Sequence, residues 1–243
     1  MGSTDVSGSS AAQHGTDRGA SGGLPRFLDW LTPFVMVLLG FAFVLGGAAM
    51  LVVFDMTLLT TMVREGSLRS DIFSQNTLAF ISYSTVQWGG IGAILTGGMM
   101  WVAAAVFRRA QWRFRSSPDV GTPPMWTVGL VGGVVTFVFG FIPLSPLLGG
   151  GVAGYLYGGQ RGAAIRVGGL SGLFAAIPVA AVVLFLFGGM AAAAMRLSLY
   201  GGVLFGLGAI VFTLVLTVAL QVGLGAVGGL VGAHFAPSRE RHG

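Results

Sequence analysis

The chain has 243 residues, of which 54% are hydrophobic and only 9% are charged, and its mean hydropathy is +0.84. Because soluble domains carry about 25% charged residues, this composition excludes an ordinary water-soluble domain. The net charge of +5 comes from arginines that lie mostly beside apolar segments, so it indicates membrane topology rather than nucleic-acid binding. The absence of cysteine excludes disulfides, thiolate metal sites and a thiol nucleophile. The class that remains is an all-α, polytopic helical membrane protein.

The N-terminal part of the chain predicts a tail followed by a membrane span. Residues 1–25 are rich in Ser and Gly with little apolar content, so we expect a disordered cytoplasmic tail and no cleavable signal peptide. Residues 30–54 carry no charge and exceed the roughly 20 apolar residues that a first span needs. Residues 55–71 are mixed in polarity and predict a short amphipathic piece outside the membrane.

A second span is expected within the next uncharged run, residues 72–107, whose first third is polar. We place this span at residues 86–107, with the polar part either extending the helix beyond the membrane or capping it there. Residues 26–115 are thus predicted to form a two-span unit, and the Pro-containing residues 116–125 a linker. Four arginines end the unit: Arg108, Arg109, Arg113 and Arg115. They serve first to orient the chain, and the further hypothesis is that they bind anionic lipid headgroups, at roughly 1 kcal/mol each.

Residues 126–235 predict a Gly-rich membrane domain of four segments. The third span is expected at 126–142, where Pro143 and Pro146 then force a turn. The next segment, 147–159, covers only about 20 Å, less than the ~30 Å hydrocarbon core. Residues 126–159 therefore form a Pro-broken helical hairpin that either spans fully or is re-entrant, and both readings return the chain to the same side.

The last two segments are longer. A fifth span is expected at residues 167–194, with a kink at Pro178. Residues 197–235 are interpreted as one long tilted helix, although two short helices broken at Gln221 and Gly223 remain possible. A short basic cytoplasmic tail, residues 236–243, ends the chain.

The arginines are distributed unequally between the two sides of this arrangement of about six spans. Because cytoplasmic loops carry an excess of Arg and Lys, we expect a multi-pass protein of the cell membrane with both termini in the cytoplasm. The cytoplasmic side would hold Arg18, Arg26, Arg108, Arg109, Arg113, Arg115, Arg161, Arg166, Arg239 and Arg241, and the other side Arg64, Arg69 and Arg196.

Glycines at every fourth residue are the most regular pattern in the chain. On a helix this spacing leaves a groove without side chains, along which a second helix packs closely. We interpret these glycines as packing positions within the chain, with a self-associating face or a ligand-lined cleft as the alternative. The series are Gly150, Gly154, Gly158 and Gly162; Gly168 and Gly172; Gly202 and Gly206; Gly225 and Gly229; and Gly89 and Gly97 with Ala93 between them.

No catalytic, cofactor or metal site is predicted. Gly223, Gly225 and Gly228 match the dinucleotide pattern G-x-G-x-x-G, but they lie inside an apolar run without the strand and acidic residue that this site requires. No Asp, Glu or Arg falls in the middle of a predicted span. Since intramembrane ionisable residues mark ion pathways and proton relays, this pattern argues against an ion-coupled pump and an intramembrane hydrolase.

Three stretches of the Gly-rich domain resemble a known family: 140–143 (Gly-Phe-Ile-Pro), 146–156 (Pro-Leu-Leu-Gly-Gly-Gly-Val-Ala-Gly-Tyr-Leu) and 168–178 (Gly-Gly-Leu-Ser-Gly-Leu-Phe-Ala-Ala-Ile-Pro). They are similar to a family of Gly-rich, four-helix membrane domains of unknown function that is common in halophilic archaea. The resemblance covers about residues 125–235 and leaves out the first two spans. It implies a four-helix membrane domain, and it implies no activity and no functional residues.

The resulting hypothesis is a non-enzymatic, membrane-organising or interaction protein. Its expected partners are the lipid bilayer and either a second copy or another membrane protein, with no nucleic acid and no cofactor. The alternative is a channel or facilitator in which the break at 143–146 contributes backbone groups to a pore, since non-helical backbone at membrane depth must line protein or water. A pore lined by Ser145, Gln160 or Gln221 would favour the channel, and a dry, packed interior would favour the first hypothesis.

Overall fold

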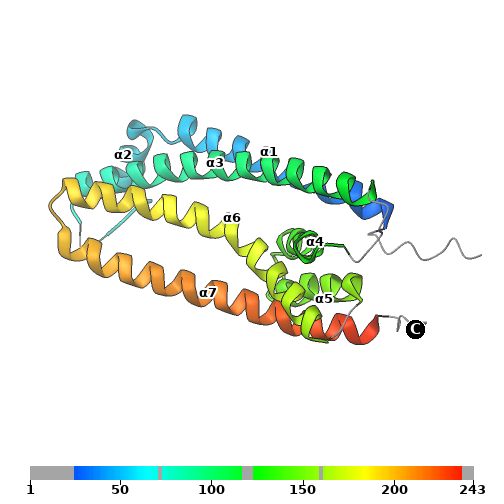
Figure 1. Ribbon diagram of the computed structural model, residues 1–243. Helices are drawn as coiled ribbons and strands as arrows, with labels where there is room; N and C mark the ends of the chain where they lie inside the picture. Colours follow the sequence, from blue (N-terminus) through cyan, green and yellow to red (C-terminus); the bar gives the residue numbers. More distant parts are fainter. Residues whose placement is uncertain (1–24, 71–72, 117–122, 159–160, 237–243) are drawn as a thin grey trace, which may run out of the picture.

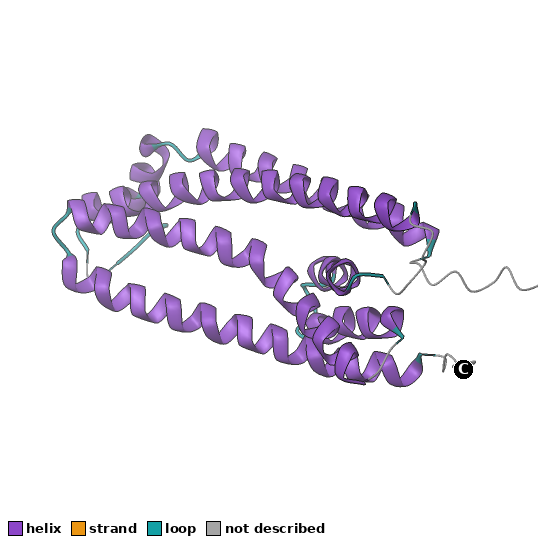
Figure 2. Cartoon of the chain, viewed as in Figure 1, coloured by secondary structure: helices purple, strands orange, loops and turns teal. Residues whose placement is uncertain are grey.

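The structure is a computed structural model that describes residues 25–70, 73–116, 123–158 and 161–236. Every regular element in these ranges is a helix, which confirms the all-α class (Figure 1, Figure 2). The helices are α1 (Arg26–Val53), α2 (Met56–Arg64), α3 (Gln75–Arg115), α4 (Met125–Val138), α5 (Ser145–Tyr157), α6 (Arg161–Arg196) and α7 (Tyr200–Phe235).

Four of these helices, α1, α3, α6 and α7, are long and apolar enough to cross a membrane. The shortest, α1, has 28 residues and is therefore about 42 Å long, more than the ~30 Å hydrocarbon core. By contrast, α4 and α5 have 14 and 13 residues, which is about 20 Å each. The described residues thus contain four helices able to span, and the expected third and fourth spans are replaced by a short hairpin.

This hairpin lies within one half of the bundle. Figure 1 looks almost along the axis of α4 while the four long helices run across the picture, so α4 lies crosswise to them. The helix ends at Val138, short of the expected residue 142, and tighter turns lead from there to Pro143, with the Gly140 N–H donating to the carbonyl oxygen of Phe137 at 3.1 Å and the Ile142 N–H to that of Phe139 at 2.8 Å. Pro146 then occupies the first turn of α5, where a missing N–H costs nothing. The re-entrant reading of residues 126–159 fits these lengths.

The long helices extend beyond the expected spans. Residues 86–107 are the middle of α3, which begins at Gln75 because the hydroxyl of Ser74 accepts a hydrogen bond from the Thr77 N–H at 3.3 Å. The polar residues therefore both cap and extend the helix. The amphipathic piece is α2, whose buried face holds Leu59 and Val63.

The last two helices begin at other residues than expected, and α7 begins at Tyr200 instead of residue 197. Helix α6 begins at Arg161, earlier than the expected 167, and bends along its length (Figure 1), as expected from Pro178 inside it. Helix α7 is continuous across Gln221 and Gly223, so the alternative of two short helices is wrong.

The helices pack in a chain of neighbours. Helix α1 packs along α3, α3 against α6, and α6 against α7, while α5 lies on both α6 and α7. Helix α4 packs on α5 and α6 and meets α1 at few residues. The most deeply buried side chains lie where α3, α4, α5 and α6 meet and include Phe107, Val128, Ala153 and Val167. The core is thus centred on the hairpin end of the bundle.

Candidate functional site

Glycines bring the backbones of α5, α6 and α7 into direct contact. A Cβ atom built on Gly150 would lie less than 3.0 Å from the carbonyl oxygen of Gly225, and one on Gly154 would lie equally close to that of Gly229. A Cβ on Gly168 would meet the same two α7 residues from the side of α6. At each of these positions the space that a side chain would need is filled by the backbone of α7, so only glycine fits. We call this arrangement the glycine junction, which also includes Gly172, facing the carbonyl of Gln221.

The series expected from residue 150 to 162 is not one groove. Gly158 ends α5 in the left-handed conformation, with φ 56°, because glycine is the residue that adopts this helix cap without strain. Gly162 belongs to α6, and a Cβ there would have no atom within 4 Å. A Cβ on Gly202 would also have open space, and one on Gly206 would reach only the ring of Phe187. The four-residue spacing therefore predicted the packing positions Gly150 and Gly154, and it did not predict that α5 ends before Gly158.

A second set of close approaches joins α1 to α3. A Cβ on Gly97 would lie 2.5 Å from the carbonyl oxygen of Gly40, and one on Gly47 would lie 2.5 Å from that of Gly90. Sequence reasoning missed Gly40, Gly47 and Gly90. The expected series from Gly89 to Gly97 divides, because Gly89 faces Leu186 of α6 instead of α1.

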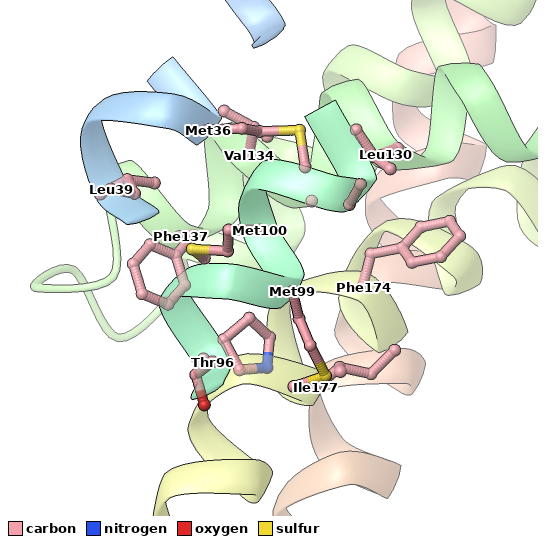
Figure 3. Close-up of a pocket in the computed structure, with 13 residues that line it drawn as sticks. Met36, Leu39, Thr96, Met99, Met100, Leu130, Val134, Phe137, Phe174 and Ile177 are labelled. Carbon is pink, nitrogen blue, oxygen red and sulfur yellow. The ribbon is translucent and has the colours of Figure 1, made fainter. Parts of the chain in front are cut away.

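An apolar cavity of about 240 Å³ lies between α1, α3, α4 and α6 (Figure 3). Its lining is almost wholly apolar and includes three methionines, and Phe174 and Pro178 bring the bend region of α6 to its wall. A cavity of about 150 Å³ lined by apolar side chains stays dry and binds benzene, so this one has room for an apolar group. Labelled lining residues in Figure 3 include Met36, Met99, Met100, Val134, Phe137 and Phe174.

Thr96 carries the only side-chain hydroxyl in this lining, and it is not free. Its Oγ1 donates to the carbonyl oxygen of Gly92 at 2.7 Å within α3. The side chains of the cavity therefore offer no unpaired polar group, and the chemistry that they support is contact with hydrocarbon. Apart from Pro178, which was expected only as a kink, no residue of this lining was singled out by the sequence, because the cavity depends on how four separate helices meet.

The residues named for a pore do not gather around this cavity. Ser145 is buried at the start of α5 and Gln221 lies in α7, whereas Gln160 is outside the described residues. Three buried polar atoms of the Gly-rich domain have no hydrogen-bond partner: Thr136 Oγ1, Ser171 Oγ and Gln221 Oε1. The first two adjoin Gly149 and Gly132, where α4 crosses α5, and neither lines the cavity. In the described part of the chain no three His, Cys, Asp or Glu residues come close enough to hold a metal ion.

The four arginines at the end of α3 separate into different environments. Arg115 forms an ion pair with Asp29 of α1, and Arg108 lines a groove between the same two helices. Arg109 and Arg113 are exposed and do not line that groove. The sequence grouped these side chains together, and the helix geometry divides them.

Comparison with known proteins relates only part of the chain to a family. Residues 126–235 match the model of a family of unknown function (DUF5518), and this range holds α4, α5, α6 and α7. The extent agrees with the resemblance that we identified from the sequence, and the match brings no activity with it. Neither the curated proteins nor the solved structures gave a significant match.

Proposed function

We propose that the protein is a non-enzymatic, membrane-organising or interaction protein whose first partner is lipid, and that its apolar cavity holds a hydrocarbon chain. The observation that supports this proposal is the cavity lining, where the single hydroxyl, on Thr96, is already bonded within its own helix. A volume of about 240 Å³ is below the usual 300–1,000 Å³ of small-molecule sites. It therefore suits a segment of a chain that enters from the bilayer better than a whole metabolite.

The chain would enter between α1 and α4. These helices meet at few residues, and the rings of Phe43 and Phe137, with centroids 5.9 Å apart, form one of their contacts. A homo-oligomer or a second membrane protein as a further partner stays a prediction.

Filling the cavity tests this proposal. Ala103→Phe would place a ring in the cavity from α3, whereas Val106→Phe adds a ring on the exposed face one turn on. With a phospholipid that carries a photoreactive diazirine at mid-chain, we expect adducts on the buried residues Met36 and Met100 in the wild type and in Val106→Phe. We expect Ala103→Phe to lose them while it melts no lower than the wild type. Unchanged adducts in a folded Ala103→Phe protein would refute the proposal.

The arrangement in the membrane is a second part of the proposal. The re-entrant hairpin returns the chain to its starting side, so four spans keep the arginine distribution expected from six. Both termini would therefore lie in the cytoplasm. Of the thirteen arginines, Arg18, Arg239 and Arg241 lie outside the described residues.

Single cysteines test this topology without background, because the chain has none. Ser67, Ser116 and Ser198 are all exposed. We expect Ser67→Cys and Ser198→Cys to react with an impermeant thiol reagent in intact cells. Ser116→Cys should react only after lysis. Labelling of Ser116→Cys in intact cells, with Ser198→Cys protected, would mean that the orientation is inverted.

A channel remains the second candidate because of the three unpartnered polar atoms in the Gly-rich domain. Water or a permeating solute would satisfy Thr136 Oγ1, Ser171 Oγ and Gln221 Oε1. Against this candidate, two of these oxygens adjoin glycine at the crossing of α4 and α5, where little space remains for water. A solute flux in vesicles that Ser171→Ala abolishes would favour the channel over the lipid-binding proposal.

A further inference from the structure

A groove of about 410 Å³ lies between α1 and α3 on the other side of the helix pair from the apolar cavity. One end of the groove carries charge, from Asp29 and Arg108. Toward the middle of the two helices its walls become apolar, with Phe34, Val37 and Trp101. The groove is thus polar where the helices end and apolar along their length, which is the polarity profile of one leaflet.

Trp101 gives the groove a fixed apolar floor. Its Nε1 donates to the carbonyl oxygen of Val37 at 3.1 Å, so the only polar atom of the ring is already bonded. The ring also contacts Phe41, with the centroids 4.8 Å apart. A molecule that lies along this part of the groove therefore meets hydrocarbon and ring faces and no free donor.

The net charge of the polar end is positive because Asp29 is neutralised. Asp29 forms an ion pair with Arg115, and its side chain is only 13% exposed. Among the described residues Arg108 has no ion-pair partner, and it is exposed. Its guanidinium is therefore available for an anion, and guanidinium groups bind phosphate oxygens in pairs.

We propose that this groove binds one anionic phospholipid, with the phosphate on Arg108 and an acyl chain along Phe34, Val37 and Trp101. Free phosphate would use only the charged end and leave the apolar floor empty. The exposed rings of Trp30 and Trp112 lie near the same ends of α1 and α3, and indoles prefer the headgroup level of a bilayer. This site lies apart from the cavity, so it does not depend on the function proposed above.

Arg115 is a positioning residue in this site. It does not line the groove, but it holds and neutralises the carboxylate of Asp29. Without Arg115, that carboxylate would repel the phosphate on Arg108. Arg109 and Arg113 have no such role. Arg109 follows Val102 and Val106 on the exposed face of α3, at spacings of seven and three residues.

Native mass spectrometry of the full-length protein, extracted from vesicles of 20% phosphatidylglycerol in phosphatidylcholine, measures the lipid that stays bound. We expect one retained phosphatidylglycerol per wild-type chain. Arg108→Gln should lower its occupancy about fivefold, which corresponds to roughly 1 kcal/mol. Arg109→Gln removes the same charge and should change the occupancy little. Inorganic phosphate at millimolar concentration should not displace the lipid.

Variants of the Asp29–Arg115 pair provide a second test, whose result unspecific attraction between arginines and anionic lipid would not reproduce. Arg115→Gln should lower the occupancy, and Asp29→Asn together with Arg115→Gln should restore it, because the unpaired carboxylate is then gone. Asp29→Asn should not rescue Arg108→Gln. Equal losses in Arg108→Gln and Arg109→Gln would mean unspecific attraction to the basic end of α3. Either that result or full retention in a folded Arg108→Gln protein would overturn the proposal.

Discussion

Replacing Gly154 by alanine is expected to lower the stability of the detergent-solubilised protein by about 3 kcal/mol or more. The new Cβ would lie less than 3.0 Å from the carbonyl oxygen of Gly229, and a backbone atom cannot move aside as a flexible side chain does. Overpacking a core costs about 1–3 kcal/mol where side chains relax, so this contact belongs at or above the upper end. The added methyl group would therefore force α5 and α7 apart. Thermal unfolding followed by circular dichroism measures the loss.

Gly162→Ala is the matched control from the same four-residue series. Its Cβ would have no neighbour within 4 Å, and Ala in a helix is more stable than Gly by roughly 0.5–1 kcal/mol. We therefore expect this variant to melt at or above the wild-type temperature. Similar losses of stability in the two variants would contradict the glycine junction, because of the two positions only Gly154 contacts α7 in the structure.

These two glycines illustrate how much of the structure could be predicted from the sequence. The apolar runs and their lengths predicted the helical membrane class, α2 and the single long α7. The four-residue spacing predicted that Gly150 and Gly154 lie in a groove, but it could not predict where α5 ends. Glycine serves equally well in a packed groove and as a left-handed helix cap, and Gly158 fits both patterns.

The sequence predicted that the chain turns at the hairpin, but it did not predict the direction in which α4 runs. Pro143 and Pro146 indicated a turn, and the short run after them indicated a segment below membrane length. The crosswise course of α4 depends on packing against α5 and α6, which no local pattern contains. The same reason hides the cavity and the groove between α1 and α3, since each is formed by residues distant in the chain.

The α1–α3 contact did leave a signal in the sequence. Gly40 and Gly47 are seven residues apart in one apolar run, and Gly90 and Gly97 have the same spacing in the next. In an antiparallel pair, a step of two turns along one helix matches a step of two turns back along the other. Gly40 meets Gly97 and Gly47 meets Gly90, which is this register. Comparing spacings between neighbouring spans would have found all four residues.

Gly97→Ala is expected to release α1 from the bundle, whereas Gly98→Ala should leave it in place. A Cβ on Gly97 would lie 2.5 Å from the carbonyl oxygen of Gly40 and 2.7 Å from a methyl carbon of Val44, and one on Gly98 would have open space. Because α1 packs almost wholly on α3, it has few other contacts to hold it. We expect a loss of about 2–3 kcal/mol for Gly97→Ala and little change for Gly98→Ala.

Hydrogen exchange locates this effect and separates it from that of Gly154→Ala. Gly97→Ala should speed amide exchange in α1 and leave α7 protected, because the glycine junction contains no residue of α1. Gly154→Ala should do the reverse and expose α5 and α7. Gly46 and Gly47 offer a second matched pair on the opposite helix, where only a Cβ on Gly47 meets α3. If Gly97→Ala loosened α7 as much as α1, the two glycine contacts would form one cooperative unit instead of two separate junctions.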